Sequence, residues 1–412
     1  MFNKITKCRV CDSKNLIDIV NLGRQPLANA LLKNKKQTKK EIKIPLILCV
    51  CKKCKLVQLK HTVKPSILFK KYFWVTATSN RVKSYRKFFF DKIKKYIKLK
   101  NNFVCEIASN DGFFLEPIKN NNDVIGIDPA ENIAKIANLK GIKTHVNFFN
   151  FNTSKKIFKI YKKKPELVIC RNVIPHIENI KSVMKGLNNI ISEDGVGAIE
   201  FHNAKNIINN NHYDYIYHEH IFYFTLTSIN DVLKRNGLYG FDYFQSPISG
   251  GSFVILFKKK KQKQTFKFKK MIYLEKKSKL NSIYSWRKLN LTCEKHREKL
   301  NNIINKIKTK KTIAAYGASA RSSTLINFLN LNNKTIKKVY DLNPLKQGLF
   351  TPGTLCKIEK PIPQNIKKND VIFLLAWNFK DEIIKFLKKI KFNGYVILPL
   401  PKIKLLRLKD ET

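Results

Sequence analysis

Residues 102–118 read NFVCEIASNDGFFLEPI, and the order of residue types predicts a strand, a tight turn and a helix. The first part is mostly apolar and the turn consists of small residues. Ala108, Ser109 and Gly112 let a ligand approach the backbone closely, and Asn110 offers a polar group at the carboxyl end of the strand. A strand, loop and helix in this order are typical of a nucleotide site in an α/β protein.

A second strand follows at residues 124–129, VIGIDP, and ends in Asp128. In a doubly wound sheet this carboxylate is placed to accept hydrogen bonds from both hydroxyls of a ribose. The glycines do not form G-x-G-x-x-G and no G-K-[ST] follows, so the sequence favours neither a dinucleotide nor an ATP P-loop. S-adenosylmethionine fits these residues better, although apolar strands and small turns occur in any parallel sheet.

The alternation of strands and helices continues along the chain. Strands predicted at 167–170 and 197–201 extend the parallel sheet. A later strand at 312–316 precedes a turn at Gly317 and an amphipathic helix, which predicts a second Rossmann-like unit. Its turn could hold phosphates of a substrate or be a plain structural crossover. Residues 258–311 are rich in Lys and lack Gly and Pro, which predicts helices between the two units.

Four of the nine cysteines form two C-x2-C pairs, Cys8 with Cys11 and Cys51 with Cys54. Two such pairs suit tetrahedral Zn²⁺, because each turn presents two thiolates on one side and soft sulfur prefers this ion to hard cations. Four thiolates leave no position for water or substrate, so the predicted Zn²⁺ is structural. The alternative is a pair of coincidental turns. These four cysteines complete a tetrahedral site, so Cys49 is not needed as a ligand.

Ionisable and aromatic side chains gather in two further segments. RNVIPH at residues 171–176 follows a predicted strand, where ligands bind in α/β sheets, and YIYHEH occupies residues 215–220. Three ionisable groups in a row among aromatics are costly to bury without a purpose, and a His near its usual pKa suits proton abstraction at neutral pH. A surface aromatic patch and a second metal site are the alternatives.

The composition is that of a large, folded and strongly basic chain. It has 412 residues, 43% of them hydrophobic, and a formal net charge of +52 from 81 Lys and Arg against 29 Asp and Glu. Such a charge raises nucleic acid or an anionic membrane as a partner, but the excess is mostly Lys and is spread over the whole chain. That distribution is typical of a solvated basic surface, so we expect no specific nucleic acid and no membrane partner.

Segments that would direct the chain to a membrane are not evident in the sequence. The longest apolar runs, such as residues 371–377, are far shorter than the ~18–20 residues that span a bilayer. Residues 1–7 contain no apolar h-region of a secretory signal. We therefore expect a cytoplasmic protein whose cysteines are thiols or metal ligands.

Together these segments resemble one known family, the S-adenosylmethionine-dependent C-methyltransferases that act on nucleotide-linked 4-keto deoxysugars. LGRQPLANALL and CKKCKLVQL are similar to its zinc domain, EIASNDGFFL and GIDPA to its cofactor motifs, YHEHIFYFT to its catalytic segment, and AYGASARSSTLINFL, DLNPLKQGLFTPGT and LLAWNF to its C-terminal domain. The resemblance implies an α/β protein with a zinc-binding domain over residues 1–62, a Rossmann-like class I methyltransferase domain over 63–256, and a helical linker with a Rossmann-like C-terminal domain over 257–412.

The resemblance also implies the roles of individual residues. His220 is the general base, Tyr217 and Glu219 lie beside it, and His176 and Asn172 line the substrate pocket. The residues implied for S-adenosylmethionine are Glu106, Ala108, Ser109, Asn110, Gly112, Asp128 and Pro129, and those for Zn²⁺ are Cys8, Cys11, Cys51 and Cys54. A ketone at C4 of the sugar acidifies the C3 proton, so the base can generate an enolate whose carbon attacks the sulfonium methyl. The implied substrate is a 4-keto deoxysugar linked to dTDP or another nucleoside diphosphate.

The chain departs from the family at three positions. Ala108 stands where the cofactor motif usually has Gly, Trp74 where a second Tyr is common, and Ser249 where the family often has His. Because of the departures at Trp74 and Ser249, the resemblance does not identify the sugar of the substrate. Methylation of an oxygen or nitrogen atom is the second hypothesis for the reaction, and a methyltransferase that binds nucleic acid is the third.

The residues leave the choice between two imidazoles open. His218 has the same chemistry as His220, and in an extended segment both would point the same way with Glu219 opposite. The assignment of His220 as the base therefore rests on the resemblance. The oligomeric state is also open, with a monomer among the options.

Overall fold

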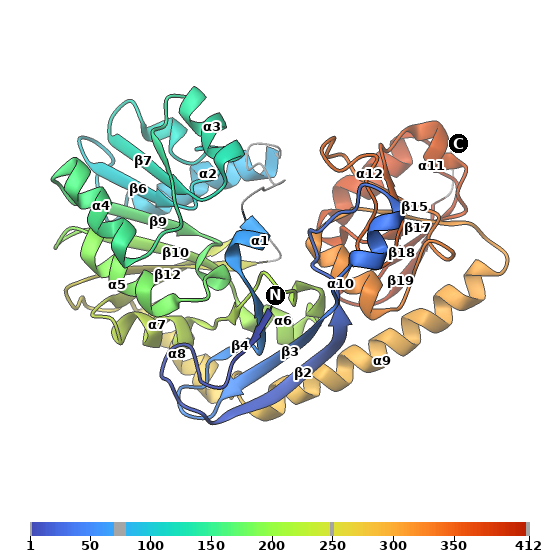
Figure 1. The fold of residues 1–412 in the computed structure, drawn as a ribbon, viewed down its shortest axis with the longest axis horizontal. Helices are drawn as coiled ribbons and strands as arrows, with labels where there is room; N and C mark the ends of the chain where they lie inside the picture. The colour runs from blue at the N-terminus through green and yellow to red at the C-terminus, as the bar shows by residue number, and fades with distance from the viewer. Residues whose placement is uncertain (1, 70–79, 248–250, 409–412) are drawn as a thin grey trace.

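The computed structural model describes residues 2–69, 80–247 and 251–408 (Figure 1). Trp74 and Ser249, two of the positions that depart from the family, lie outside the described residues. The described chain forms two α/β units and a four-stranded sheet that lies below and between them in Figure 1. None of its described helices is both long and apolar enough to cross a lipid bilayer.

The first α/β unit contains a seven-stranded sheet in the order β12-β13-β10-β9-β6-β7-β8. The five strands from β10 to β8 run parallel, and β13 is antiparallel to both of its neighbours. The strands are β6 (Phe103–Ile107), β7 (Asp123–Asp128), β8 (Thr144–Val146), β9 (Leu167–Arg171), β10 (Val196–His202), β12 (Tyr239–Ser246) and β13 (Ser252–Lys258). The mixed α/β class predicted from the sequence is confirmed.

Helices cover both faces of this sheet, so every residue of the central strands β6 and β10 is buried. Buried side chains of four helices form the core on one face, and those of two others the core on the opposite face. The first four are α4 (Phe151–Tyr161), α5 (Ile180–Ile190), α7 (Leu226–Lys234) and α8 (Phe266–Lys277), and the other two are α2 (Asn80–Ile93) and α3 (Glu131–Leu139).

The helix predicted directly after Gly112 is wrong. The chain there forms turns and a single turn of 3-10 helix, η3 (Glu116–Ile118). Gly112 has a φ of +72°, Pro117 lacks a backbone N–H, and three consecutive Asn residues follow, a combination that favours turns over a helix.

The four-stranded sheet is antiparallel, with the order β11-β4-β3-β2. Its strands are β2 (Leu16–Gln25), β3 (Ile44–Cys51), β4 (Val57–Leu59) and β11 (Phe222–Tyr223), and a separate pair is formed by β1 (Phe2–Lys4) and β5 (His61–Val63). Two short helices, η1 (Lys35–Lys40) and α1 (Pro65–Phe69), complete this part. Strand β11 comes from the first α/β unit, directly after residues 215–220, so this segment is tied to the N-terminal sheet.

The second α/β unit contains a six-stranded sheet in the order β16-β15-β14-β17-β18-β19, parallel except for β19. Its strands are β14 (Ile313–Tyr316), β15 (Lys338–Tyr340), β16 (Lys357–Glu359), β17 (Val371–Leu374), β18 (Tyr395–Leu398) and β19 (Lys404–Arg407), and its helices are α10 (Ala320–Phe328), α11 (Pro363–Lys367) and α12 (Lys380–Lys389). The first five strands follow the same spatial order as β8-β7-β6-β9-β10, which confirms a second Rossmann-like unit.

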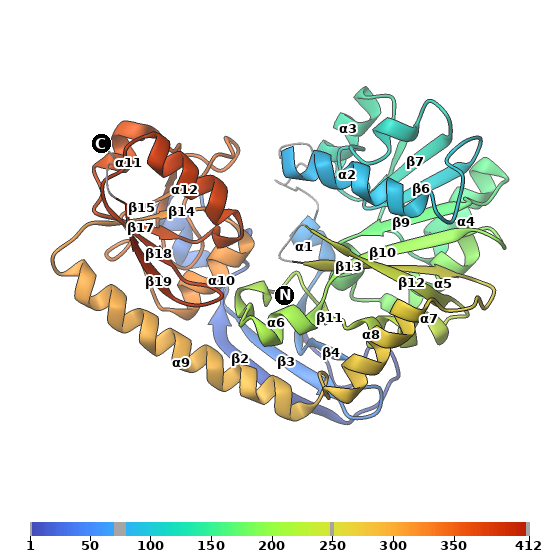
Figure 2. The ribbon, with the colours of Figure 1, turned by 180° about the vertical axis from the view of Figure 1, so that it is seen from behind.

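The Lys-rich region forms the predicted helices, α8 and the long α9 (Ile283–Lys308). Helix α9 runs along the four-stranded sheet and reaches the second α/β unit, as both ribbon views show (Figures 1 and 2). Side chains of β2, β3, α9, α6 (Ala204–Asn209) and η5 (Tyr213–Tyr215) join the second sheet in one hydrophobic core. The chain from η5 onward therefore lies where both units and the N-terminal sheet meet.

Candidate functional site

The four cysteines of the two C-x2-C pairs meet beside the turn that joins β3 to β4. Their Sγ atoms all lie within 4.8 Å of one another, with Cys8 3.6 Å from Cys54 and Cys11 3.6 Å from Cys51. Four thiolates bound tetrahedrally to Zn²⁺ at ~2.3 Å would be about 3.8 Å apart, so the residues fit the ion. Within the described ranges, no other group of His, Cys, Asp and Glu side chains is close enough to hold a metal.

A polar side chain supports this cysteine cluster from β4. Gln58 Nε2 donates a hydrogen bond to Cys8 Sγ at 3.3 Å, and Gln58 Oε1 accepts one from the backbone N–H of Arg9 at 3.2 Å. Cys49 lies outside the cluster, and its Sγ donates instead to the carbonyl oxygen of Gln58 at 3.5 Å. The set of four predicted from the spacing therefore forms without Cys49.

The predicted cofactor turn lies at the carboxyl edge of the first sheet. Ala108, Asn110 and Gly112 have φ angles of 55°, 52° and 72°. Asp128, at the end of β7, accepts hydrogen bonds from the backbone N–H groups of Asn110 and Ala130, both at 2.9 Å. Burial raises the pKa of Asp128, and these two hydrogen bonds oppose that shift. Each carboxylate oxygen of Asp128 accepts one hydrogen bond here and can accept a second one.

Three buried polar atoms of β6 and the turn after it have no partner within the described chain, Glu106 Oε2, Ser109 Oγ and Asp111 Oδ1. The other Glu106 oxygen accepts from Arg171 Nε at 2.9 Å, and burial raises the pKa of Glu106 to about 7 against the effect of Arg171. Buried polar atoms without partners are rare in proteins, and a bound polar ligand would satisfy them. With the partly exposed Pro129 following Asp128, the residues fit S-adenosylmethionine.

His220 is a buried member of the set of predicted catalytic side chains. Its Nδ1 lies 2.8 Å from the carbonyl oxygen of Tyr215 and its Nε2 lies 2.7 Å from Tyr217 Oη. Because a carbonyl only accepts, Nδ1 carries the hydrogen and Nε2 accepts from the Tyr217 hydroxyl. Burial, and then the neighbouring His176, lowers the pKa of His220 well below its usual value, so the imidazole is neutral.

A cavity with about 290 Å³ of empty space, part of it open to solvent, lies beside this imidazole. Its lining comprises Asn172, Pro175, His176, His202, Ile207, Tyr215, His220, Phe222 and Tyr223. The rings of His176 and His220 meet edge to face with their centres 4.8 Å apart. Burial lowers the pKa of His176 to about 4, so this imidazole is neutral as well. Three predicted site residues, Asn172, His176 and His220, thus share one cavity.

Glu219 points toward the N-terminal part of the chain. Its Oε1 accepts a hydrogen bond from Asn29 Nδ2 at 2.6 Å, and burial raises its pKa to about 7 while Asn29 opposes the shift. Asn29 belongs to the LGRQPLANALL stretch, to which the sequence analysis assigned no chemistry. The spacing gives no signal for this contact, because it joins residues 190 positions apart.

His218 and His220 do not face the same way. The chain turns between them, with the His220 backbone N–H donating to the Tyr217 carbonyl oxygen at 2.9 Å, so the extended segment considered from the sequence is not formed. His218 packs near the start of β3 with the backbone of Ile44 and Pro45, and it is not among the residues that line the cavity. Burial lowers the pKa of His218 to about 4.

Two cavity residues were missed by the sequence analysis as separate candidates, Tyr215 and His202. The Tyr215 ring stacks on His202 with 3.8 Å between ring centres and on His220 with 4.4 Å. His202 ends β10 at the same carboxyl edge as the other site residues, and that position was the available signal. Tyr215 was part of the quoted segment, but its stacking depends on the turn.

Comparison with known proteins gives matches along nearly the whole chain. Residues 8–69 match a zinc binding domain family, residues 79–242 a methyltransferase domain family, and residues 247–401 the family of the C-methyltransferase C-terminal domain. C-methyltransferase NovU from Streptomyces niveus is 29% identical over 403 residues, which cover 96% of each chain.

Solved structures give weaker likenesses. Magnesium protoporphyrin IX methyltransferase from Synechocystis PCC 6803 with bound SAM has 13% identity and a TM-score of 0.33, over 45% of this chain and 86% of that chain. A S-adenosylmethionine-dependent methyltransferase from Clostridium acetobutylicum ATCC 824 has 15% identity and a TM-score of 0.35, over 44% and 93%.

The three matched families follow one another in the order of the cysteine cluster, the first α/β unit and the second α/β unit. The turn after β6 fits S-adenosylmethionine and the cysteine cluster fits Zn²⁺, so these two are the cofactors of the protein. The chain is therefore an S-adenosylmethionine-dependent methyltransferase, and it is similar to the C-methyltransferases in its C-terminal domain and along nearly its whole length.

Proposed function

We propose that this methyltransferase acts on C3 of a 4-keto deoxysugar linked to dTDP or another nucleoside diphosphate. The main support is the neutral imidazole of His220, which lines a cavity at the same sheet edge as the cofactor turn. A saturated carbon must lose a proton before it can attack a sulfonium methyl group, and a ketone beside that carbon makes the proton acidic enough for an imidazole. The basic surface of the chain, with a net charge of +52, suits a diphosphate-linked substrate.

In the proposed reaction, the Nε2 lone pair of His220 removes the C3 proton. The Tyr217 hydroxyl, which donates to Nε2 before the substrate binds, is then free to donate to the C4 oxygen as negative charge develops there. S-adenosylmethionine supplies a methyl group on a sulfonium. The C3 carbanion forms the new C–C bond while the C–S bond breaks, and the proton remains on His220 until solvent takes it.

The other residues of the cavity orient the sugar in this proposal. Neutral His176 can either donate or accept a hydrogen bond, and Asn172 can do both. Glu219, with a pKa of about 7, is suited to bind a sugar hydroxyl, and Asn29 fixes its orientation. On the cofactor side, we assign the ribose hydroxyls to Asp128. The turn from Ala108 to Gly112, with Glu106 and Pro129 beside it, would hold the remainder of the cofactor.

The proposal is tested by incubating the purified protein with S-adenosylmethionine and a panel of nucleoside-diphosphate 4-keto deoxysugars, followed by mass spectrometry. The expected product is heavier by one methyl group, and fragmentation places it on C3. In D₂O without S-adenosylmethionine, the same sugar should exchange its C3 proton. Methyl transfer only to an oxygen or nitrogen atom, or to substrates without a ketone beside the methylated position, would rule the enolate mechanism out.

A further inference from the structure

The second α/β unit contacts the chain just before Tyr217 and His220 through a buried ion pair. Arg321, in the first turn of α10, donates from Nε to Asp214 Oδ2 at 2.9 Å and from Nη2 to Asp214 Oδ1 at 3.0 Å. The indole Nε1 of Trp377 also donates to Asp214 Oδ2, at 2.9 Å. The Asp214 side chain is 1% exposed and that of Arg321 12% exposed. All three donors to this carboxylate therefore come from the second unit.

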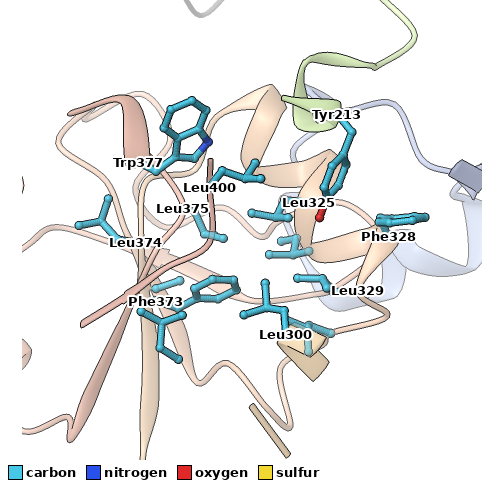
Figure 3. Close-up of a cluster of buried hydrophobic side chains, with 14 of the residues drawn as sticks. Tyr213, Leu300, Leu325, Phe328, Leu329, Phe373, Leu374, Leu375, Trp377 and Leu400 are labelled. Carbon is cyan, nitrogen blue, oxygen red and sulfur yellow. The ribbon is translucent and has the colours of Figure 1, made fainter. Parts of the chain in front are cut away.

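Tyr213 and Ile216, close to Asp214 in the chain, are held by the second unit and by α9. Tyr213 reaches into its core beside Leu325 and Phe328, as Figure 3 shows. Its hydroxyl lies 2.9 Å from Nδ1 of His296 on α9. The hydroxyl of Thr324 donates to the carbonyl oxygen of Ile216 at 3.0 Å. Side chains outside the first unit thus hold three of the four residues from 213 to 216.

The remaining residue of this stretch, Tyr215, contacts both Arg321 and the imidazole of His220. Arg321 lies over its ring, with the guanidinium carbon 5.2 Å from the ring centre. The same ring stacks on His220, and the carbonyl oxygen of Tyr215 receives the hydrogen of His220 Nδ1. This carbonyl fixes which nitrogen of His220 carries the hydrogen and which has the lone pair.

We infer that Arg321 is a positioning residue, which orients His220 and selects its Nδ1–H tautomer through Asp214 and Tyr215. Without the guanidinium, the buried Asp214 carboxylate would keep only the hydrogen bond from Trp377 and would have no counter-charge. A buried charge in this state is costly, so Asp214 would move toward water and displace the adjacent Tyr215 carbonyl. Lys would not replace Arg fully, because a single ammonium cannot form two parallel hydrogen bonds. The second α/β unit thereby takes part in the reaction without contacting the reacting atoms. The tautomer inference rests on geometry alone, and its effect on turnover rests on the proposed function.

The first experiment needs no substrate. Two-bond ¹H–¹⁵N spectra of ¹⁵N-histidine-labelled protein report the tautomer of each imidazole, and His220→Asn identifies the His220 signals. The wild type should show a single neutral Nδ1–H form. Arg321→Met should show a mixture of tautomers, and Arg321→Lys a smaller change. Lys338→Met removes an ion pair with Glu359 in the same unit, at 2.8 Å and away from this segment, and should leave the spectrum unchanged. An unaltered His220 spectrum in Arg321→Met would overturn the inference.

The second experiment measures kinetics with the sugar that gains a methyl group in the screen. Arg321→Met should lower kcat on the order of 10²-fold with little change in KM for either substrate, since small displacements of a catalytic group have effects of this size. Arg321→Lys should recover part of this loss, and Lys338→Met should resemble the wild type. A raised KM with unchanged kcat would show that Arg321 binds the substrate directly and would overturn the inference. If the wild-type protein transfers no methyl group to any sugar of the panel, the proposed function is rejected. The tautomer inference is then tested by the spectra alone.

Discussion

At the scale of single residues, His218 and His220 form a matched pair of buried imidazoles. The two residues are 2% and 5% exposed, so a substitution at either position disturbs the packing of a similarly buried side chain. Only His220 lines the cavity and contacts Tyr217, whereas His218 packs near the start of β3. A comparison of the two therefore separates a chemical role from a contribution to packing.

We predict that His220→Asn lowers methyl transfer about 10²–10⁴-fold, because general-base catalysis contributes that much. The affinity for S-adenosylmethionine should not change, since the predicted cofactor turn is built from other elements. His218→Asn should retain most of the activity and lose mainly stability. Rates of methyl transfer and of C3 proton exchange in D₂O, measured for both variants, check this. Exchange close to the wild-type rate in His220→Asn would remove His220 from the role of base.

The sequence predicted the cluster of site residues better than their orientation. Asn172, His176 and His220 follow predicted strands or lie in a segment dense in ionisable groups, and they do share a cavity. The direction of His218 and the contact of Glu219 with Asn29 were not predictable. The first depends on a turn that no Gly or Pro marks, and the second on the docking of a distant segment.

At the scale of secondary structure elements, β3 offers a matched pair of cysteines. Cys49 and Cys51 are both fully buried on this strand, but only Cys51 belongs to the cluster that fits Zn²⁺. We predict that Cys51→Ser lowers the zinc content well below one ion per chain and destabilises the protein, because metal binding contributes to folding. Cys49→Ser should retain one Zn²⁺. Metal analysis of protein purified without chelator checks both, and full zinc content in Cys51→Ser would contradict the prediction.

Helices and strands were predicted correctly where a local sequence pattern is enough to identify them. The parallel strands are continuous apolar runs because helices cover both sheet faces, and such runs are visible in the sequence. The helix after Gly112 was predicted wrongly because its apolar residues, FFL, were given more weight than Pro117 and the Asn residues behind it. The addition of β11 to the N-terminal sheet joins residues more than 160 positions apart along the chain, and no local pattern indicates it.

At the scale of the whole molecule, buried ionisable groups make stability depend on pH. Burial lowers the pKa values of His176, His212 and His218 to about 4, from 6.5. The unfolded chain binds these protons more readily, so their contribution to stability is complete above pH 6.5 and is lost as the pH falls toward 4. Glu106 and Glu219, with pKa values raised to about 7, act in the opposite direction, because their stabilisation is present at low pH and lost as the pH rises through 7.

We predict that the histidine effect prevails, so that the free energy of unfolding is lower at pH 5 than at pH 7.5. Seven histidines have lowered pKa values, the three above together with His61, His145, His220 and His296, against five carboxyl groups with raised values, Glu41, Glu106, Asp128, Glu200 and Glu219. A histidine shifted from 6.5 to about 4 costs about 2 kcal/mol at pH 5. His218→Gln, which removes one such group outside the cavity, should therefore lose less stability on acidification than the wild type, by roughly that amount. Urea unfolding of both proteins at the two pH values measures the difference. Equal losses would show that the His218 imidazole titrates in the folded protein as it does in the unfolded chain.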